Sequence, residues 1–142
     1  MDTLFHDEAL IELHTIGDWL RYSVSQFQQA GLFYGHGTDN AWDEAVQLLL
    51  PLLSLPQGCP PSIQNARLLS HERQLLLDAL KMRVEQRIPT PYITHTAWFA
   101  GYEFYVDERV LIPRSPIAEL IDGRFAPWLA LEPKRIMDLC TG

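Results

Sequence analysis

The sequence contains little cysteine and no long apolar run. Its 142 residues include two cysteines, Cys59 and Cys140, which are too few and too far apart for a disulfide framework. No stretch of about 18 apolar residues occurs, which excludes an ordinary transmembrane helix. The first residues also lack the basic and apolar segments of a secretory signal. A membrane partner is therefore not expected, and the reducing cytoplasm is the expected compartment.

Basic residues are almost missing from the first 60 positions, where Arg21 stands alone. Residues 61–142 hold ten basic and ten acidic residues, so the net charge of −7 belongs to residues 1–60. Such a surface repels nucleic acid and attracts a basic partner, although it could equally serve solubility alone. The eight acids of this range are Asp2, Asp7, Glu8, Glu12, Asp18, Asp39, Asp43 and Glu44.

The apolar pattern predicts a mainly helical chain. With 47% hydrophobic residues, the chain can bury a core, and its length allows one domain plus a piece of another. Apolar residues at steps of three and four predict a helix over 7–29 that ends at Gly31. Two further helices are expected, one from Ala41 after the N-cap Asn40 to about Pro51, and one from the N-cap Ser70 to about Arg87.

The helical spacing of apolar residues gives way to short β-type runs after position 91. Short β-type runs at 98–99, 104–106 and 110–112, with a glycine between the first two, predict a small antiparallel hairpin. A fourth helix is expected over 117–129. Residues 136–140 then resemble a buried parallel strand that leads into a turn. A parallel strand needs a second strand to hydrogen-bond with, and the sequence offers none. We therefore expect a fragment that ends at the start of a second domain, with 135–142 loosely packed or paired with another copy.

No catalytic or metal-binding motif is present. The sequence has no G-x-S-x-G, no P-loop lysine and no H-E-x-x-H, and its five histidines lack metal-ligand spacing. One weak cofactor signal stands at the end, where a glycine-rich loop could begin and bring backbone N–H groups to a ligand. An ordinary strand-to-turn boundary explains these residues nearly as well. They are Asp138, Cys140, Thr141 and Gly142.

Several longer stretches resemble the HemK/PrmC/PrmB family, which are S-adenosylmethionine-dependent methyltransferases of a glutamine side-chain amide in proteins. They read RIPTPYI at 87–93, WFAGYEFYVD at 98–107, VLIPRSPIAELI at 110–121 and DLCTG at 138–142. Ser115, Pro116 and Cys140 depart from the usual release-factor pattern. At these positions, and in the loop at 34–40, the sequence resembles the PrmB branch, which acts on a large-subunit ribosomal protein.

The resemblance implies three parts. Residues 1–92 would form a helical substrate-recognition domain, residues 93–114 a β-hairpin linker, and residues 115–142 the start of a truncated Rossmann-like methyltransferase domain. Leu111, Pro113 and Arg114 would lie beside the cofactor and substrate pocket. The four residues of the terminal loop would begin the S-adenosylmethionine site of the parent enzyme.

The family's catalytic Asn-Pro-Pro-Tyr motif is absent, because neither Asn40 nor Asn65 precedes a proline. We therefore expect this chain to bind no cofactor and to methylate nothing by itself. Its expected role is recognition of a basic ribosomal protein, without direct binding to nucleic acid. The alternatives are a fragment of a release-factor or adenine-specific DNA methyltransferase, or a free-standing helical adaptor.

Overall fold

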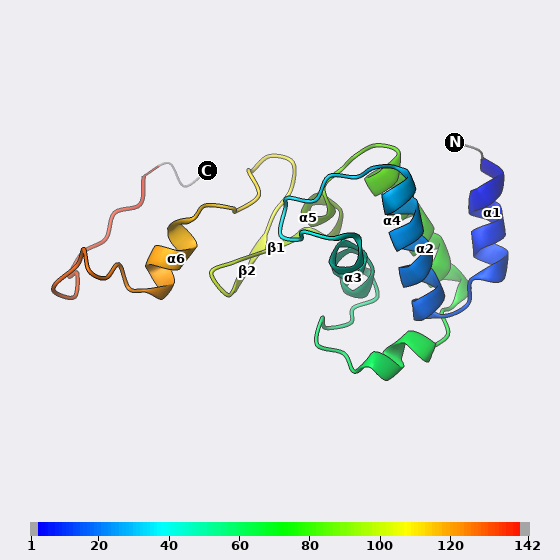
Figure 1. Ribbon diagram of the computed structural model, residues 1–142, viewed down its shortest axis with the longest axis horizontal. Helices are drawn as coiled ribbons and strands as arrows, with labels where there is room; N and C mark the ends of the chain where they lie inside the picture. The colour runs from blue at the N-terminus through cyan, green and yellow to red at the C-terminus, as the bar shows by residue number, and fades with distance from the viewer. Residues whose placement is uncertain (1–2, 140–142) are drawn as a thin grey trace.

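Helices dominate the computed structural model, which describes residues 3–139, with side chains from residue 7 onward (Figure 1). The predicted mainly helical fold with one antiparallel hairpin is confirmed. The elements in chain order are α1 (Thr3–Glu12), α2 (Ile16–Gln29), α3 (Ala41–Leu52), the 3₁₀ helix η1 (Pro61–Asn65), α4 (Ser70–Val84), α5 (Thr90–Thr94), β1 (Thr96–Phe99), β2 (Tyr102–Tyr105) and α6 (Ile117–Asp122).

The single helix predicted over 7–29 is wrong, because the chain breaks before Ile16 into α1 and α2. At the break, Thr15 Oγ1 accepts a hydrogen bond from Asp18 N at 3.1 Å, and Asp18 Oδ2 accepts one from Thr15 N at 2.8 Å. This reciprocal capping box starts a new helix. Thr15 also forms an isolated antiparallel bridge with Arg67. Local capping and a distant backbone partner therefore override the continuous apolar period.

The end of α2 follows the prediction. Gly31 has a φ of +56°, which favours glycine. Its N–H donates to Gln28 O at 3.1 Å, and the N–H of Leu32 donates to Phe27 O at 3.1 Å. These two bonds make a Schellman motif that satisfies the last carbonyls of the helix.

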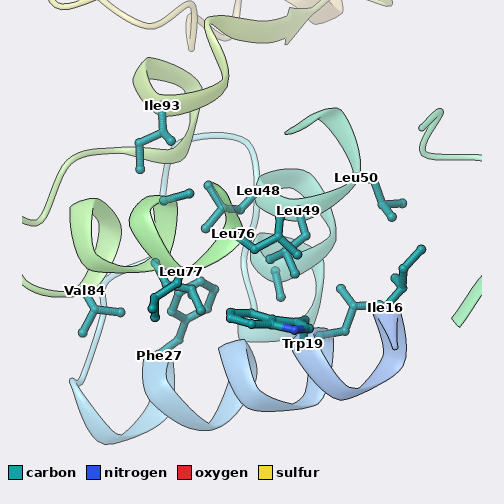
Figure 2. Packing of buried hydrophobic residues seen from close by; sticks show 14 of the residues in the cluster. Ile16, Trp19, Phe27, Leu48, Leu49, Leu50, Leu76, Leu77, Val84 and Ile93 are labelled. Carbon is teal, nitrogen blue, oxygen red and sulfur yellow. The ribbon is translucent and has the colours of Figure 1, made fainter. Parts of the chain in front are cut away.

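The main core lies between α2, α3 and α4. Trp19 and Phe27 of α2 are fully buried and point towards α3 and α4 (Figure 2). The facing residues are also buried, and they are Leu48, Leu49, Leu76 and Leu77. Because each buried aliphatic side chain stabilises the fold by about 1.5–3 kcal/mol, this cluster is the main source of stability.

The starts of α3 and α4 differ in how well the sequence predicts them. Asn40 caps α3 as expected, since its Oδ1 accepts from Asp43 N at 2.9 Å. The predicted N-cap Ser70 is wrong by one residue, because Leu69 holds that position and its N–H donates to Glu72 Oε2 at 2.7 Å. A leucine side chain cannot accept a hydrogen bond, so Glu72, three residues later, is the residue that marks the start of this helix in the sequence.

The hairpin joins β1 and β2 in the register Thr96↔Tyr105 to Phe99↔Tyr102. Its two turn residues, Ala100 and Gly101, have φ values of +49° and +78°, as a type I′ turn requires. The third β-type run, at 110–112, is not a strand. The run packs against the hairpin instead, and its Ile112 forms a second, smaller buried cluster with Ala97 and Val106.

The chain beyond the hairpin extends away from the helical part (Figure 1). Helix α6 covers six residues rather than the predicted 117–129, because the backbone turns left-handed at Arg124 and Phe125. The strand expected at 136–140 is not formed over its described part, where Ile136 is 85% exposed and Met137 is 80% exposed. No neighbouring strand among the described residues offers hydrogen-bond partners here.

Candidate functional site

The loop at 33–40 is held in place by one buried carboxylate. Glu44, in the first turn of α3, is 3% exposed, and its Oε1 accepts hydrogen bonds from Arg83 Nε and from Thr90 Oγ1, both at 2.7 Å. Its Oε2 accepts from the hydroxyl of Thr38. Arg83 Nη2 also donates to Phe33 O at 3.1 Å. One side chain therefore connects the loop to α3, α4 and α5.

The ion pair itself is shielded from water, because the side chains of Arg83 and Glu44 are only 6% and 4% exposed. Burial raises the pKa of the Tyr34 phenol, and the negative charge of Glu44 raises it further. The buried charges of Glu44 and Arg83 face each other and have several additional hydrogen-bond partners, which is the condition for a buried pair to persist. Glu44 is therefore a structural residue, and it is not available to a binding partner.

The acids of the first 60 residues do not form one continuous surface. Glu44 is buried, and Asp18 caps α2. Of the remaining acids whose side chains the structure describes, one group is exposed on α1, which packs against α4. The other group is Asp39 and Asp43, at the start of α3. The α1 group consists of Asp7, Glu8 and Glu12.

Asp39 and Asp43 form an organised pair. The Asn40 Nδ2 group donates to Asp39 Oδ1 at 2.8 Å and to Asp43 Oδ2 at 2.7 Å. Within residues 3–139, neither carboxylate has a basic ion-pair partner. The amide therefore holds two exposed negative charges side by side, where they can bind a cation from outside.

The hairpin exit brings together four of the residues predicted for the cofactor pocket. One open hollow of about 670 Å³, next to the hairpin, is lined by Leu111, Pro113, Arg114 and Asp138. Leu111 is 71% exposed within it. The other predicted members, Cys140, Thr141 and Gly142, lie outside the described residues.

The described part of this hollow does not make a complete S-adenosylmethionine site. The segment that carries Asp138 is not a strand, and its apolar neighbours Ile136 and Leu139 are exposed. A nucleotide-like cofactor needs a formed strand that delivers a glycine-rich turn to it.

A second set of hollows lies between the loop at 33–40, the segment after α3 and the hairpin. A cavity of about 60 Å³ is bordered by His36, Thr90, Trp98 and Pro113. The His36 Nδ1 atom is buried and has no hydrogen-bond partner in the described part of the chain. The sequence did not single out Trp98 as a site residue. Its exposure on a strand whose neighbour Ala97 is buried follows from strand alternation.

Between residues 3 and 139, no group of three or more histidine, cysteine or acidic side chains is placed so that it could hold a metal ion. In the same range, no helix combines the length and apolar character needed to cross a membrane.

Comparison with known proteins gives a clear relationship. Over 135 residues, or 94% of the chain, the sequence is 52% identical to the ribosomal protein uL3 glutamine methyltransferase of Xanthomonas campestris pv. campestris. The chain is homologous to the N-terminal portion of uL3 glutamine methyltransferases. The Xylella fastidiosa protein of the same name is also 52% identical over 135 residues.

The relationship covers less than half of each relative. The matched region is 44% of the Xanthomonas protein and 43% of the Xylella protein. No protein-family model matches the chain, and no solved structure matches it. The predicted resemblance to methyltransferases that act on a large-subunit ribosomal protein is confirmed by these relatives.

Proposed function

We propose that this chain is the substrate-recognition part of a methyltransferase that modifies a glutamine of ribosomal protein uL3. The 52% identity over 94% of the chain supports this proposal most strongly. The same relationship favours uL3 over a release factor or DNA as the substrate. The acidic charge of residues 1–60 also disfavours contact with DNA.

The chain by itself transfers no methyl group under this proposal. An amide nitrogen is a poor nucleophile, so its lone pair must be aligned with the methyl donor by fixed hydrogen-bond acceptors. In the family that the sequence resembles, an Asn-Pro-Pro-Tyr motif provides them and S-adenosylmethionine is the donor. The 142 residues do not contain that motif.

Recognition would depend on charge. Ribosomal proteins are strongly basic, and a pair of exposed carboxylates attracts them over the Debye length and orients them on approach. Asp39 and Asp43 supply such a pair beside the loop that Glu44 anchors. The α1 acids lie on a different element.

The test measures binding of the purified chain to purified uL3 by calorimetry, at low and at high salt. We expect the double variant Asp39→Lys/Asp43→Lys to bind uL3 more weakly than the wild type, mainly at low salt. The matched control is Glu8→Lys/Glu12→Lys, which makes the same charge change on α1. Equal affinities for all three chains would show that the acids serve solubility only.

A second assay follows methyl transfer from radiolabelled S-adenosylmethionine to uL3. No transfer is expected with this chain, and transfer would overturn the proposed lack of activity. Glu44 is left unchanged in both assays, because its reversal would place a positive charge beside the buried Arg83.

A further inference from the structure

Three neighbouring hollows with shared lining residues lie between the loop at 33–40, the segment after α3 and the hairpin. The first, of about 540 Å³, is bordered by Asp39 and Asp43 and shares Gln47 and Gln57 with the cavity of about 60 Å³. The third, of about 790 Å³, shares Trp98 with that cavity. We call these three hollows the hairpin groove.

The hairpin groove is lined by carboxylates and by no lysine or arginine. Asp39 and Asp43 line the hollow of about 540 Å³, and Glu103 of β2 lines the hollow of about 790 Å³. Within the part of the chain that the structure describes, no ion pair neutralises any of the three. The groove is therefore electrostatically complementary to a positively charged chain.

Trp98 and Glu103 are paired across the hairpin, so their side chains lie on the same face of the two strands. The Trp98 side chain is 54% exposed and forms a wall of the groove together with Pro51 and Pro56. An indole face next to a carboxylate suits a lysine or arginine, whose alkyl stem packs on the ring while its cation meets the acid.

The cavity of about 60 Å³ borders the hairpin exit. Ile112 and Pro113 line both the cavity of about 60 Å³ and the hollow that contains Leu111, Arg114 and Asp138. A chain that lies in the groove therefore leads towards the residues that the sequence predicts to border the cofactor pocket.

We propose that an extended, basic segment of the protein substrate binds in the hairpin groove, with one cationic side chain on Trp98 and Glu103 and another at Asp39 and Asp43. The bound segment brings the substrate glutamine near Pro113, which lines both the groove and the hollow at the hairpin exit. This inference rests on the proposed function, since it specifies how that substrate is held.

Calorimetry with the full chain and purified uL3 tests the groove. Trp98→Leu keeps an apolar side chain but removes the aromatic face, and we expect it to weaken binding about tenfold. Glu103→Lys reverses the adjacent charge and is expected to weaken binding at low salt by a similar factor. Thermal melts of both variants check that they remain folded.

Two matched controls lie outside the groove. Trp128 is 79% exposed and lies beyond α6, so Trp128→Leu should bind uL3 like the wild type. Glu12→Lys makes the same charge change on α1 and should also bind like the wild type. Equal weakening by a groove variant and its control would overturn the specific role of the groove.

The binding of the wild-type chain separates a failure of the groove assignment from a failure of the proposed function. If the wild-type chain binds uL3 and both groove variants bind it equally well, the groove is wrong and the proposed function stands. If the wild-type chain does not bind uL3, the proposed function fails, and the groove assignment fails with it.

Discussion

The Arg83 Nε atom lies 2.7 Å from Glu44 Oε1, and both side chains are buried in the centre of the helical part. The two residues are 39 positions apart in the sequence. Their contact determines where the loop at 33–40 lies, because Glu44 also binds Thr38 and Arg83 also binds the Phe33 carbonyl. Glu44 also holds Thr90, and both Thr38 and Thr90 line the proposed binding groove.

Removing one partner of this pair should strongly destabilise the fold. Glu44→Ala leaves Arg83 charged, buried and without its carboxylate, and the expected loss is about 3–5 kcal/mol of unfolding free energy. Urea denaturation measures the loss. The exposed control Glu12→Ala should change the unfolding free energy by less than about 0.5 kcal/mol. A loss for Glu44→Ala no larger than that of the control would contradict this account.

The Asp18 cap should make stability depend on acid pH. Hydrogen bonds from the Thr15 backbone and side chain hold the pKa of Asp18 below its ordinary value of 3.8. A lowered pKa in the folded state stabilises the protein above pH 3.8, and this contribution is lost as the pH falls through the lowered pKa.

The variant Asp18→Ala should therefore be less stable than the wild type at neutral pH, by about 1 kcal/mol, as is usual for a lost cap. The difference should shrink as the pH falls below 3.8. Thermal unfolding between neutral and strongly acidic pH follows it, with Asp7→Ala on α1 as the control. A difference that stays constant with pH would contradict a role for the charged carboxylate.

Gly17 should resist replacement although it lies inside a helix. A Cβ at this position would lie 3.1 Å from Gln64 O, so η1 would have to move. Alanine improves helix propensity by about 1 kcal/mol, but the crowding is expected to outweigh that gain and lower the melting temperature of Gly17→Ala. Gly58→Ala is the control, because a Cβ there meets nothing within 4 Å. An unchanged melting temperature for Gly17→Ala would show that η1 adapts freely.

Removing the segment after Arg114 should leave the stability of the helical part unchanged. Residues 115–139 contribute no buried side chain, and Leu131 is 85% exposed. A chain that ends at Arg114 should therefore keep the melting temperature and the affinity for uL3 of the longer chain. A large drop in melting temperature would show that this segment belongs to the same folding unit and would contradict the proposed domain division.

The sequence predicts several local features because short-range chemistry controls them. Asn40 caps its helix through a neighbour three residues away, and Gly31 accepts a left-handed backbone that other residues avoid. The turn at Ala100 and Gly101 likewise depends on two adjacent residues. Such features need no partner from a distant part of the chain.

Other predictions failed where distant contacts decide. The helix over 7–29 breaks at Thr15, which bridges to Arg67. The β-type run at 110–112 is not a strand, and its Ile112 packs with Ala97 and Val106 of the hairpin region. The strand expected at 136–140 is absent over its described part, because strand formation requires a partner to hydrogen-bond with. The high exposure of Ile136 and Met137 agrees with the loose packing expected for 135–142. Apolar periodicity alone contains no information about any of these partners.

The sequence by itself determined the helical class, the hairpin, the total charge of the first 60 residues and the resemblance to the methyltransferase family. Only the tertiary structure decided what the individual acids do. Glu44 is buried against Arg83, Asp18 caps a helix, and Asp39 and Asp43 are held together beside one surface hollow. The physical reason is that a charge sum depends on composition alone, whereas a carboxylate's role depends on its burial and its partners.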